Sequence, residues 1–181
     1  MSEQAPNQSL IWMTILVAAA ILFSLALACG MPFAALGALA ALTLPKRDAM
    51  VFAGLGWLAN QAIGFGFLAY PLDTMTFAWG IALCMSALGA VVGAERAQGL
   101  LAGSSSLVRT GAAFLSAWAV QQGVVFVASL VLGGTENAFT ASVVWFIFWT
   151  NALAFVVLVC LQSVGARIGL AHSLKGQPAI R

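Results

Sequence analysis

The stretch of chain from residue 138 to residue 164 reads AFTASVVWFIFWTNALAFVVLVCLQSV. It contains no Asp, Glu, Lys, Arg or His. A helix rises about 1.5 Å per residue, so about 20 apolar residues suffice to cross the roughly 30 Å of hydrocarbon in a bilayer. This stretch is therefore long and apolar enough to cross a membrane as one helix.

The composition of the whole chain also indicates a membrane protein. Of its 181 residues, 62% are hydrophobic and only 7% are charged, and the mean hydropathy is +1.04. Such a chain has too few polar side chains to cover the surface of a soluble globule. We therefore expect an integral membrane protein whose main partner is the lipid bilayer. The net charge of +2 gives no support to a nucleic-acid partner.

Polar or turn-forming residues divide the chain into six apolar segments. Their bounds are 10–28, 32–44, 50–70, 74–94, 107–132 and 138–164, and a tail at 165–181 completes a single membrane domain. The second segment is short for a span, and Cys29-Gly30-Met31-Pro32 separates it from the first. Residues 1–9 carry no Lys or Arg, so the first segment does not resemble a cleaved signal peptide. We predict an all-α, polytopic membrane protein with six transmembrane helices in three hairpins.

The basic residues predict the orientation of these helices. In the six-span arrangement all of them fall on one side of the membrane, and none falls on the other: Lys46, Arg47, Arg96, Arg109, Arg167, Lys175 and Arg181. Cytoplasmic loops of membrane proteins carry an excess of Lys and Arg. We therefore expect both termini in the cytoplasm, and the plasma membrane, or the inner membrane of a Gram-negative cell, as the location.

Five carboxamide side chains fall near the middle of three predicted spans: Asn60, Gln61, Gln121, Gln122 and Asn151. Trp57 shares a helix face with Asn60 and Gln61, and Trp118 is placed in the same way before Gln121 and Gln122. Two interpretations remain open. The amides can hydrogen-bond the helices to one another, or they can bind a neutral or zwitterionic polar solute.

No Asp, Glu, Lys, Arg or His lies in the middle of any predicted span. Proton relays, voltage sensors and ion-coupled pumps normally need such a group at membrane depth, so these classes are disfavoured. Enzyme motifs are also missing, because Ser104-Ser105-Ser106 lacks the G-x-S-x-G pattern and has no His near it. We do not expect an enzyme.

Sulfur side chains offer a candidate metal site at the first outward turn, where Cys29 and Met31 flank Gly30. Soft sulfur ligands favour Cu(I) and other soft metals. The alternative is ordinary apolar packing, which is common for Cys and Met in membrane helices. Cys84 and Cys160 form no C-x-x-C motif with Cys29, so a disulfide framework is not expected.

The chain resembles the S-components, the small six-helix substrate-binding subunits of energy-coupling-factor vitamin transporters. The likeness consists of its size, six spans with both ends inside, and an Ala/Gly-rich segment at 34–41 that also holds the small-residue pairs Ala34/Ala38 and Gly37/Ala41. It implies a substrate-binding subunit, energising transporter subunits or a second copy as partners, and, for the solitary cobalamin type, Cys29 as a cobalt ligand.

Two functions follow as hypotheses. The first is a transport protein, either a substrate-binding subunit or a small facilitator, for a vitamin, a metal-containing cofactor such as cobalamin, or another small polar solute. The second is a scaffold or assembly protein that packs against a larger membrane complex through its small-residue faces, such as the one carrying Gly89 and Gly93.

Overall fold

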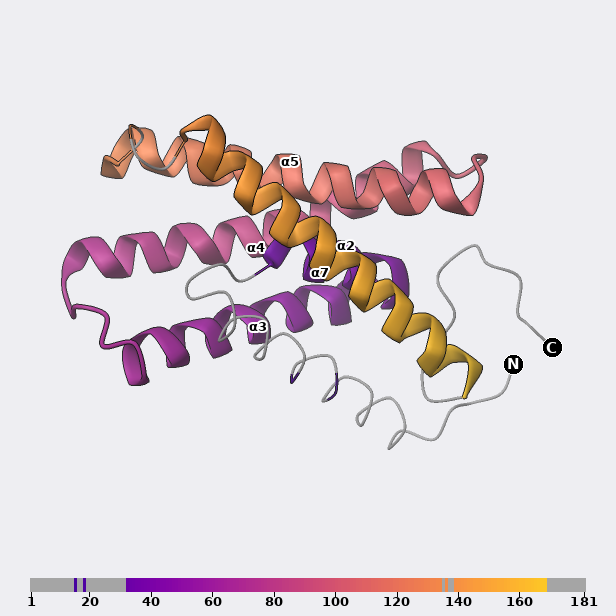
Figure 1. The fold of residues 1–181 in the computed structure, drawn as a ribbon, viewed down its shortest axis with the longest axis horizontal. Helices are drawn as coiled ribbons and strands as arrows, with labels where there is room; N and C mark the ends of the chain where they lie inside the picture. The colour runs from indigo at the N-terminus through magenta and orange to yellow at the C-terminus, as the bar shows by residue number, and fades with distance from the viewer. Residues whose placement is uncertain (1–14, 16–17, 19–31, 135, 137–138, 169–181) are drawn as a thin grey trace.

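The computed structural model describes Ile15, Ala18 and residues 32–134, 136 and 139–168. Throughout this part of the chain the regular structure is helical, with no strand, which confirms the all-α prediction for it (Figure 1). The helices are α2 (Phe33–Thr43), α3 (Lys46–Gly66), α4 (Thr74–Leu100), α5 (Ser106–Leu132) and α7 (Ala141–Arg167).

Three of these helices are long and apolar enough to cross a membrane. They are α4, α5 and α7, each of 27 residues, and they contain most of the segments predicted at 74–94, 107–132 and 138–164. The segment predicted at 50–70 begins earlier, because the helix starts at Lys46 directly after Pro45, and it ends at Gly66. The segment predicted at 10–28 lies outside the described residues.

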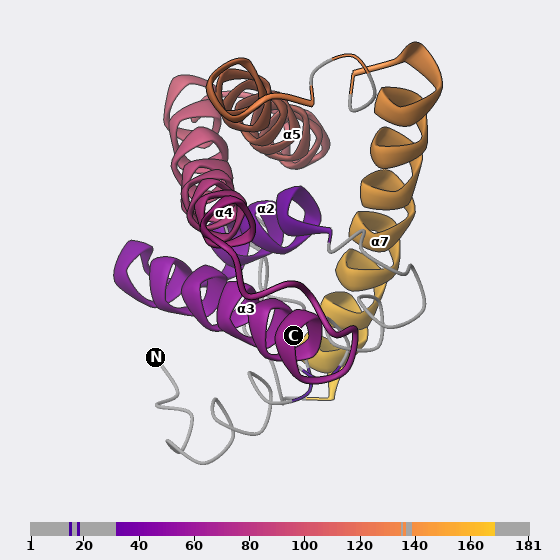
Figure 2. The same ribbon diagram turned by 90° about the vertical axis from the view of Figure 1, so that its left-hand side faces the viewer.

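Helices α3, α4 and α5 run along the length of the molecule, and α7 crosses them obliquely (Figure 1). Seen along the bundle, α3, α4 and α5 stand on one side, α7 on the other, and α2 between them (Figure 2). Helix α2 contacts all four of the other helices. Every residue from Phe33 to Leu42 is buried, so α2 is the centre of the core.

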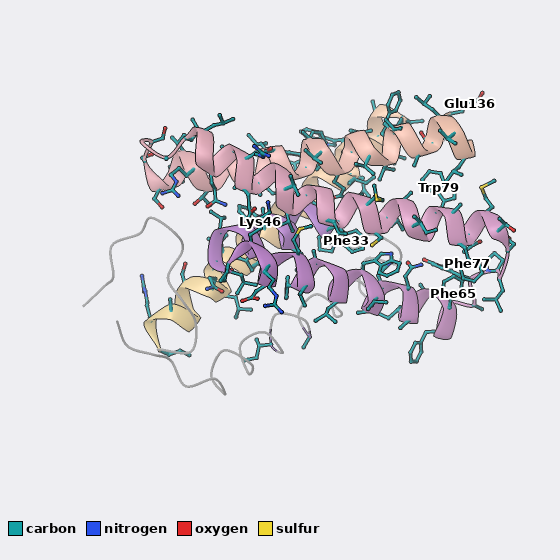
Figure 3. All side chains as sticks on the ribbon, turned by 180° about the vertical axis from the view of Figure 1, so that it is seen from behind. Phe33, Lys46, Phe65, Phe77, Trp79 and Glu136 are labelled. Atoms are coloured by element: carbon teal, nitrogen blue, oxygen red, sulfur yellow. The ribbon has the colours of Figure 1, made fainter. Side chains whose placement is uncertain are left out.

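Helix α2 is too short to cross a bilayer. Its 11 residues span about 16 Å, roughly half of the hydrocarbon thickness. Phe33, its first residue, lies between the Lys46 end and the Glu136 end of the molecule (Figure 3). The second segment, predicted to be short for a span, forms a helix that begins partway along the bundle and ends just before Lys46.

Small residues let these helices approach closely. A Cβ atom added to Gly37 of α2 would lie 2.9 Å from the Ala90 Cβ and 3.1 Å from the Val91 backbone nitrogen, both on α4. On α4, the Gly93 carbonyl accepts a hydrogen bond of 2.9 Å from the Ser116 hydroxyl of α5. The small-residue faces singled out in the sequence are thus used between helices of the same chain.

Charged residues of the described helices lie near helix ends. Lys46, Arg47 and Asp48 start α3, and Lys46 approaches Glu95, near the end of α4, at 4.0 Å. At the opposite end, the Asp73 carboxylate accepts a hydrogen bond of 2.7 Å from the Thr76 N–H and caps α4. Ser105 and Thr140 cap α5 and α7 in the same way, whereas the N-cap position of α2 is Pro32, which supplies no side-chain acceptor.

Candidate functional site

A cavity of about 140 Å³ lies between the helices at the beginning of α2. This is close to the volume of about 150 Å³ that accommodates benzene in an engineered protein cavity. Side chains of five helices form its walls: Phe33, Asn60, Leu83, Gln121, Gln122, Val125, Phe146, Ile147, Thr150 and Asn151. None of these lining residues is ionisable, so the polar part of the wall consists of amides and one hydroxyl.

Four of the five amides predicted to form a layer line this cavity. Asn60 comes from α3, Gln121 and Gln122 from α5, and Asn151 from α7. Gln121, Gln122 and Asn151 are buried, with 6%, 9% and 2% of their surface exposed. Helices from three different parts of the chain therefore bring their amides to one partly open cavity.

Asn151 replaces the missing N-cap of α2. Its Oδ1 accepts a hydrogen bond of 3.3 Å from the Ala35 N–H, in the first turn of α2. Its Nδ2 donates to the Ile147 carbonyl one turn earlier in α7, at 3.0 Å. The first N–H groups of a helix have no partner within the helix, so an acceptor from α7 satisfies one of them. Asn151 thus has a structural role.

Gln121 has no comparable structural bond. Its Oε1 is buried and makes no hydrogen bond to any residue that the structure describes. A buried carbonyl oxygen without a partner costs about 1–3 kcal/mol, so such groups are normally satisfied by water, an ion or a ligand. The Gln121 carbonyl therefore has an acceptor position that no described residue fills.

Gln61 and Trp57 face α4 and do not line the cavity. Trp57 Nε1 donates a hydrogen bond of 2.8 Å to the Gly80 carbonyl, and a Cβ atom on Gly80 would meet the Gln61 Nε2. Gln61 Oε1 accepts from Asn60 Nδ2 at 3.4 Å. Gly64, one turn after Gln61, leaves no open space, because the Tyr70 ring folds back from the following loop and packs against it.

Trp118 also lies outside the lining. Its ring packs edge-on against Phe148 of α7, with centroids 5.2 Å apart. Its Nε1 is buried and has no partner among the described residues. Although the sequence places Trp57 and Trp118 alike before their amides, the two indoles meet different helices.

The sequence did not single out the other lining residues. Leu83, Val125, Phe146 and Ile147 are apolar residues of apolar helices, and nothing in their spacing distinguishes them from lipid-facing neighbours. Phe33 lines the cavity because α2 begins between the two ends of the bundle. Of these residues, Thr150 could have been identified from the sequence, because it is a polar residue next to Asn151 in an otherwise apolar run.

The candidate metal ligands Cys29 and Met31 lie outside the described residues. Within the described ranges, no group of three or more His, Cys, Asp or Glu side chains is placed to hold a metal ion.

Comparison with known proteins gives no relative: no protein-family model, curated protein or solved structure matches this chain.

Proposed function

We propose that this chain is a six-span protein of the plasma membrane, or of the inner membrane in a Gram-negative cell, that holds a small polar solute at mid-depth. It acts as a substrate-binding subunit of a transporter or as a small facilitator. The observation that carries the proposal is the cavity into which α3, α5 and α7 bring Asn60, Gln121, Gln122 and Asn151.

The hydrogen bonds support a binding role for part of this amide group. Amides that only hold helices together should be bonded to other helices, as Asn151 is to Ala35. Gln121 is buried beside the cavity with its carbonyl oxygen unpartnered among the described residues. Its burial is costly without a partner, and because the oxygen has almost no accessible surface, a solute in the cavity reaches it only if the Gln121 side chain turns.

The interrupted helix supports the same proposal. Membrane transporters commonly form their substrate sites near the bilayer midplane, beside helices that stop or start within the membrane. Helix α2 begins at mid-depth after Pro32, and its first residue, Phe33, lines the cavity. This is an argument from general transporter architecture, and it adds to the argument from Gln121.

The cavity volume favours a small solute among those expected. About 140 Å³ accommodates a molecule of roughly the size of benzene. A corrinoid such as cobalamin is many times larger, so an S-component of the cobalamin type would have to bind it elsewhere or in a more open arrangement. We therefore favour a small polar solute over a vitamin or a metal-containing cofactor.

The alternative function, a scaffold for a larger membrane complex, rested on exposed small-residue faces. In the structure Gly37 packs on α4, and Gly89 and Gly93 pack against Val120 of α5. These faces are already occupied within the chain, so no specific observation favours the scaffold.

Mass spectrometry of the protein purified in its native lipids tests the proposal. We expect a small polar solute to co-purify with the wild type and to be lost from Thr150→Phe, which fills the cavity. The matched control is Ser142→Phe, an exposed position near the start of the same helix, which should retain the solute. Equal solute content in lipid alone, or in wild type and Thr150→Phe, would contradict the proposal.

A further inference from the structure

The cavity opens beside Phe146, and its wall combines apolar residues with neutral hydrogen-bonding groups. We infer, on the premise that the proposed function holds, that the solute is a small uncharged amphiphile. It has an apolar body with a single hydroxyl or carbonyl group, and it reaches the cavity from the bilayer and not from water.

Gln122 and Thr150 supply polar atoms that a solute can reach. Both residues line the cavity, and neither side chain makes a hydrogen bond to the residues that the structure describes. In this part of the chain, the polar side-chain atoms enclosed without a partner are Arg109 Nε, Trp118 Nε1 and Gln121 Oε1. The amide of Gln122 and the hydroxyl of Thr150 are not among them, so both keep accessible surface. Each of these groups offers a donor and an acceptor.

The rest of the wall limits how polar the solute can be. Half of the lining residues are apolar, namely Phe33, Leu83, Val125, Phe146 and Ile147. A solute with polar groups on every side would leave some of them unpaired against these residues, and each unpaired group is costly. A volume of about 140 Å³ accommodates a molecule of roughly the size of benzene. An apolar body of this size with one polar group matches such a wall.

Charge excludes the related ions. None of the lining residues is ionisable. A carboxylate or an ammonium group would lose its hydration in the cavity without gaining a partner of opposite charge. An uncharged hydroxyl or carbonyl group avoids this cost and still bonds to an amide.

Phe146 marks the opening of the cavity. Its side chain is 59% exposed, whereas the other lining residues are buried or half-buried. Helix α7, which carries Phe146, packs mainly on α2 and makes little contact with α5 (Figure 2). The cavity therefore reaches the surface of the bundle beside Phe146.

The depth of Phe146 places this opening in lipid. Helix α7 has 27 residues and is about 40 Å long, whereas the hydrocarbon of a bilayer is roughly 30 Å thick. About 5 Å of the helix therefore extends beyond the hydrocarbon at each end. Phe146 is the sixth residue of α7 and lies about 8 Å from its start. A solute that passes Phe146 thus comes from the acyl chains.

Four small solutes test the chemistry: butanol, butyrate and butylammonium, each fluorinated at the end of its chain, and glycerol as an unlabelled competitor. Each is titrated against the full chain in lipid nanodiscs, with binding followed by fluorine NMR and empty nanodiscs as the baseline. We expect saturable binding of butanol only, without displacement by glycerol. Gln122→Leu should weaken it about tenfold, as for the loss of one hydrogen bond. The control is Gln98→Leu, another buried glutamine, which does not line the cavity and should leave binding unchanged.

Paramagnetic broadening tests the route. A nitroxide on the lipid acyl chains should broaden the fluorine signal of bound butanol more than a gadolinium chelate dissolved in the water does, because the opening faces hydrocarbon. Stronger broadening by the chelate would overturn entry from the bilayer.

Binding of butyrate or butylammonium as tight as that of butanol, or displacement of butanol by glycerol at equal concentration, would overturn the uncharged amphiphile while leaving a solute-binding protein. Equal affinity in Gln122→Leu and wild type would also overturn it. The comparison of solutes on the wild type stands even where Gln122→Leu fails to fold. Absence of any saturable binding overturns this inference, whereas the proposed function is decided separately by the solute that co-purifies from native membranes.

Discussion

Two amides that look alike in the sequence have different roles in the structure. Asn151 is bonded at both ends, to the Ala35 N–H and to the Ile147 carbonyl. Gln121 is equally buried and keeps its carbonyl oxygen without a partner among the described residues. A sequence shows that both residues are amides at depth, but it does not show whether a neighbouring backbone already satisfies them.

We expect Asn151→Leu to lower the free energy of unfolding by about 1–2 kcal/mol, because the first turn of α2 loses its cap inside the bundle. Reversible unfolding by SDS in mixed micelles measures this change. Gln122→Leu is the matched control: it is a buried amide on the same cavity that makes no hydrogen bond to the described residues, so its loss should be smaller. Equal losses in the two variants would show that Asn151 does not cap α2.

Asp73 gives the fold a dependence on pH. The backbone N–H and the hydroxyl of Thr76, which donate to it, lower the pKa of the Asp73 carboxyl below its ordinary value. Because the pKa is lower in the folded state, this contribution is fully present above the unfolded value and is lost as pH falls through the folded value. We expect the melting temperature of wild type to decrease between about pH 4 and more acidic solution.

Asp73→Asn retains an oxygen that can cap α4 but cannot ionise. Its melting temperature should therefore decrease less than that of wild type over the same acidic range. Parallel melting curves of the two proteins provide the measurement. Identical acid dependence in both would remove Asp73 as a source of the effect.

At the scale of elements, the sequence predicted a short second segment and the chain break before it, because Gly30 and Pro32 are recognisable there. It did not predict that this segment would be the most buried of the described helices. The reason is that an Ala/Gly-rich apolar run is compatible with a lipid-facing position as well as a central one, and only the close approach of α4 distinguishes them.

Gly37→Ala tests this close approach. The added Cβ would lie 2.9 Å from the Ala90 Cβ and 3.1 Å from the Val91 nitrogen, so the two helices must separate. We expect a loss of about 1–3 kcal/mol in the free energy of unfolding, as for other overpacked cores. Gly54→Ala, in α3 with open space around it, should instead gain about 0.5–1 kcal/mol from reduced backbone entropy. A stabilised Gly37→Ala would contradict the tight α2–α4 packing.

At the scale of the whole molecule, the composition and the lengths of the apolar runs sufficed to predict helices long and apolar enough to cross a membrane, and three of the described helices are of this kind. The cavity could be predicted only in part. Polar residues in apolar helices are conspicuous, so four lining amides were found, whereas the apolar walls were not. Gln61 illustrates the limit: the Tyr70 ring occupies the space at Gly64, and this depends on how the following loop folds back.

The predicted orientation has a direct test in cysteine labelling. In a background in which Cys29, Cys84 and Cys160 are replaced, single cysteines are introduced at Asp73 and Glu136 at one end of the bundle and at Arg47 and Arg96 at the other. A membrane-impermeant maleimide should label the first pair in intact cells and the second pair only after permeabilisation, because basic residues remain in the cytoplasm. Labelling of Arg96→Cys in intact cells would show that the orientation is opposite to the predicted one.

The enclosed position of α2 also constrains the order of assembly. The ribosome makes α2 before the helices that surround it, and Asn151, which accepts from the Ala35 N–H, follows 116 residues later. Until then the start of α2 lacks this acceptor, and the helix is too short to cross the bilayer by itself. The bond from Ala35 to Asn151 can therefore form only after α7 has been translated, so the capping of α2 is completed late in synthesis.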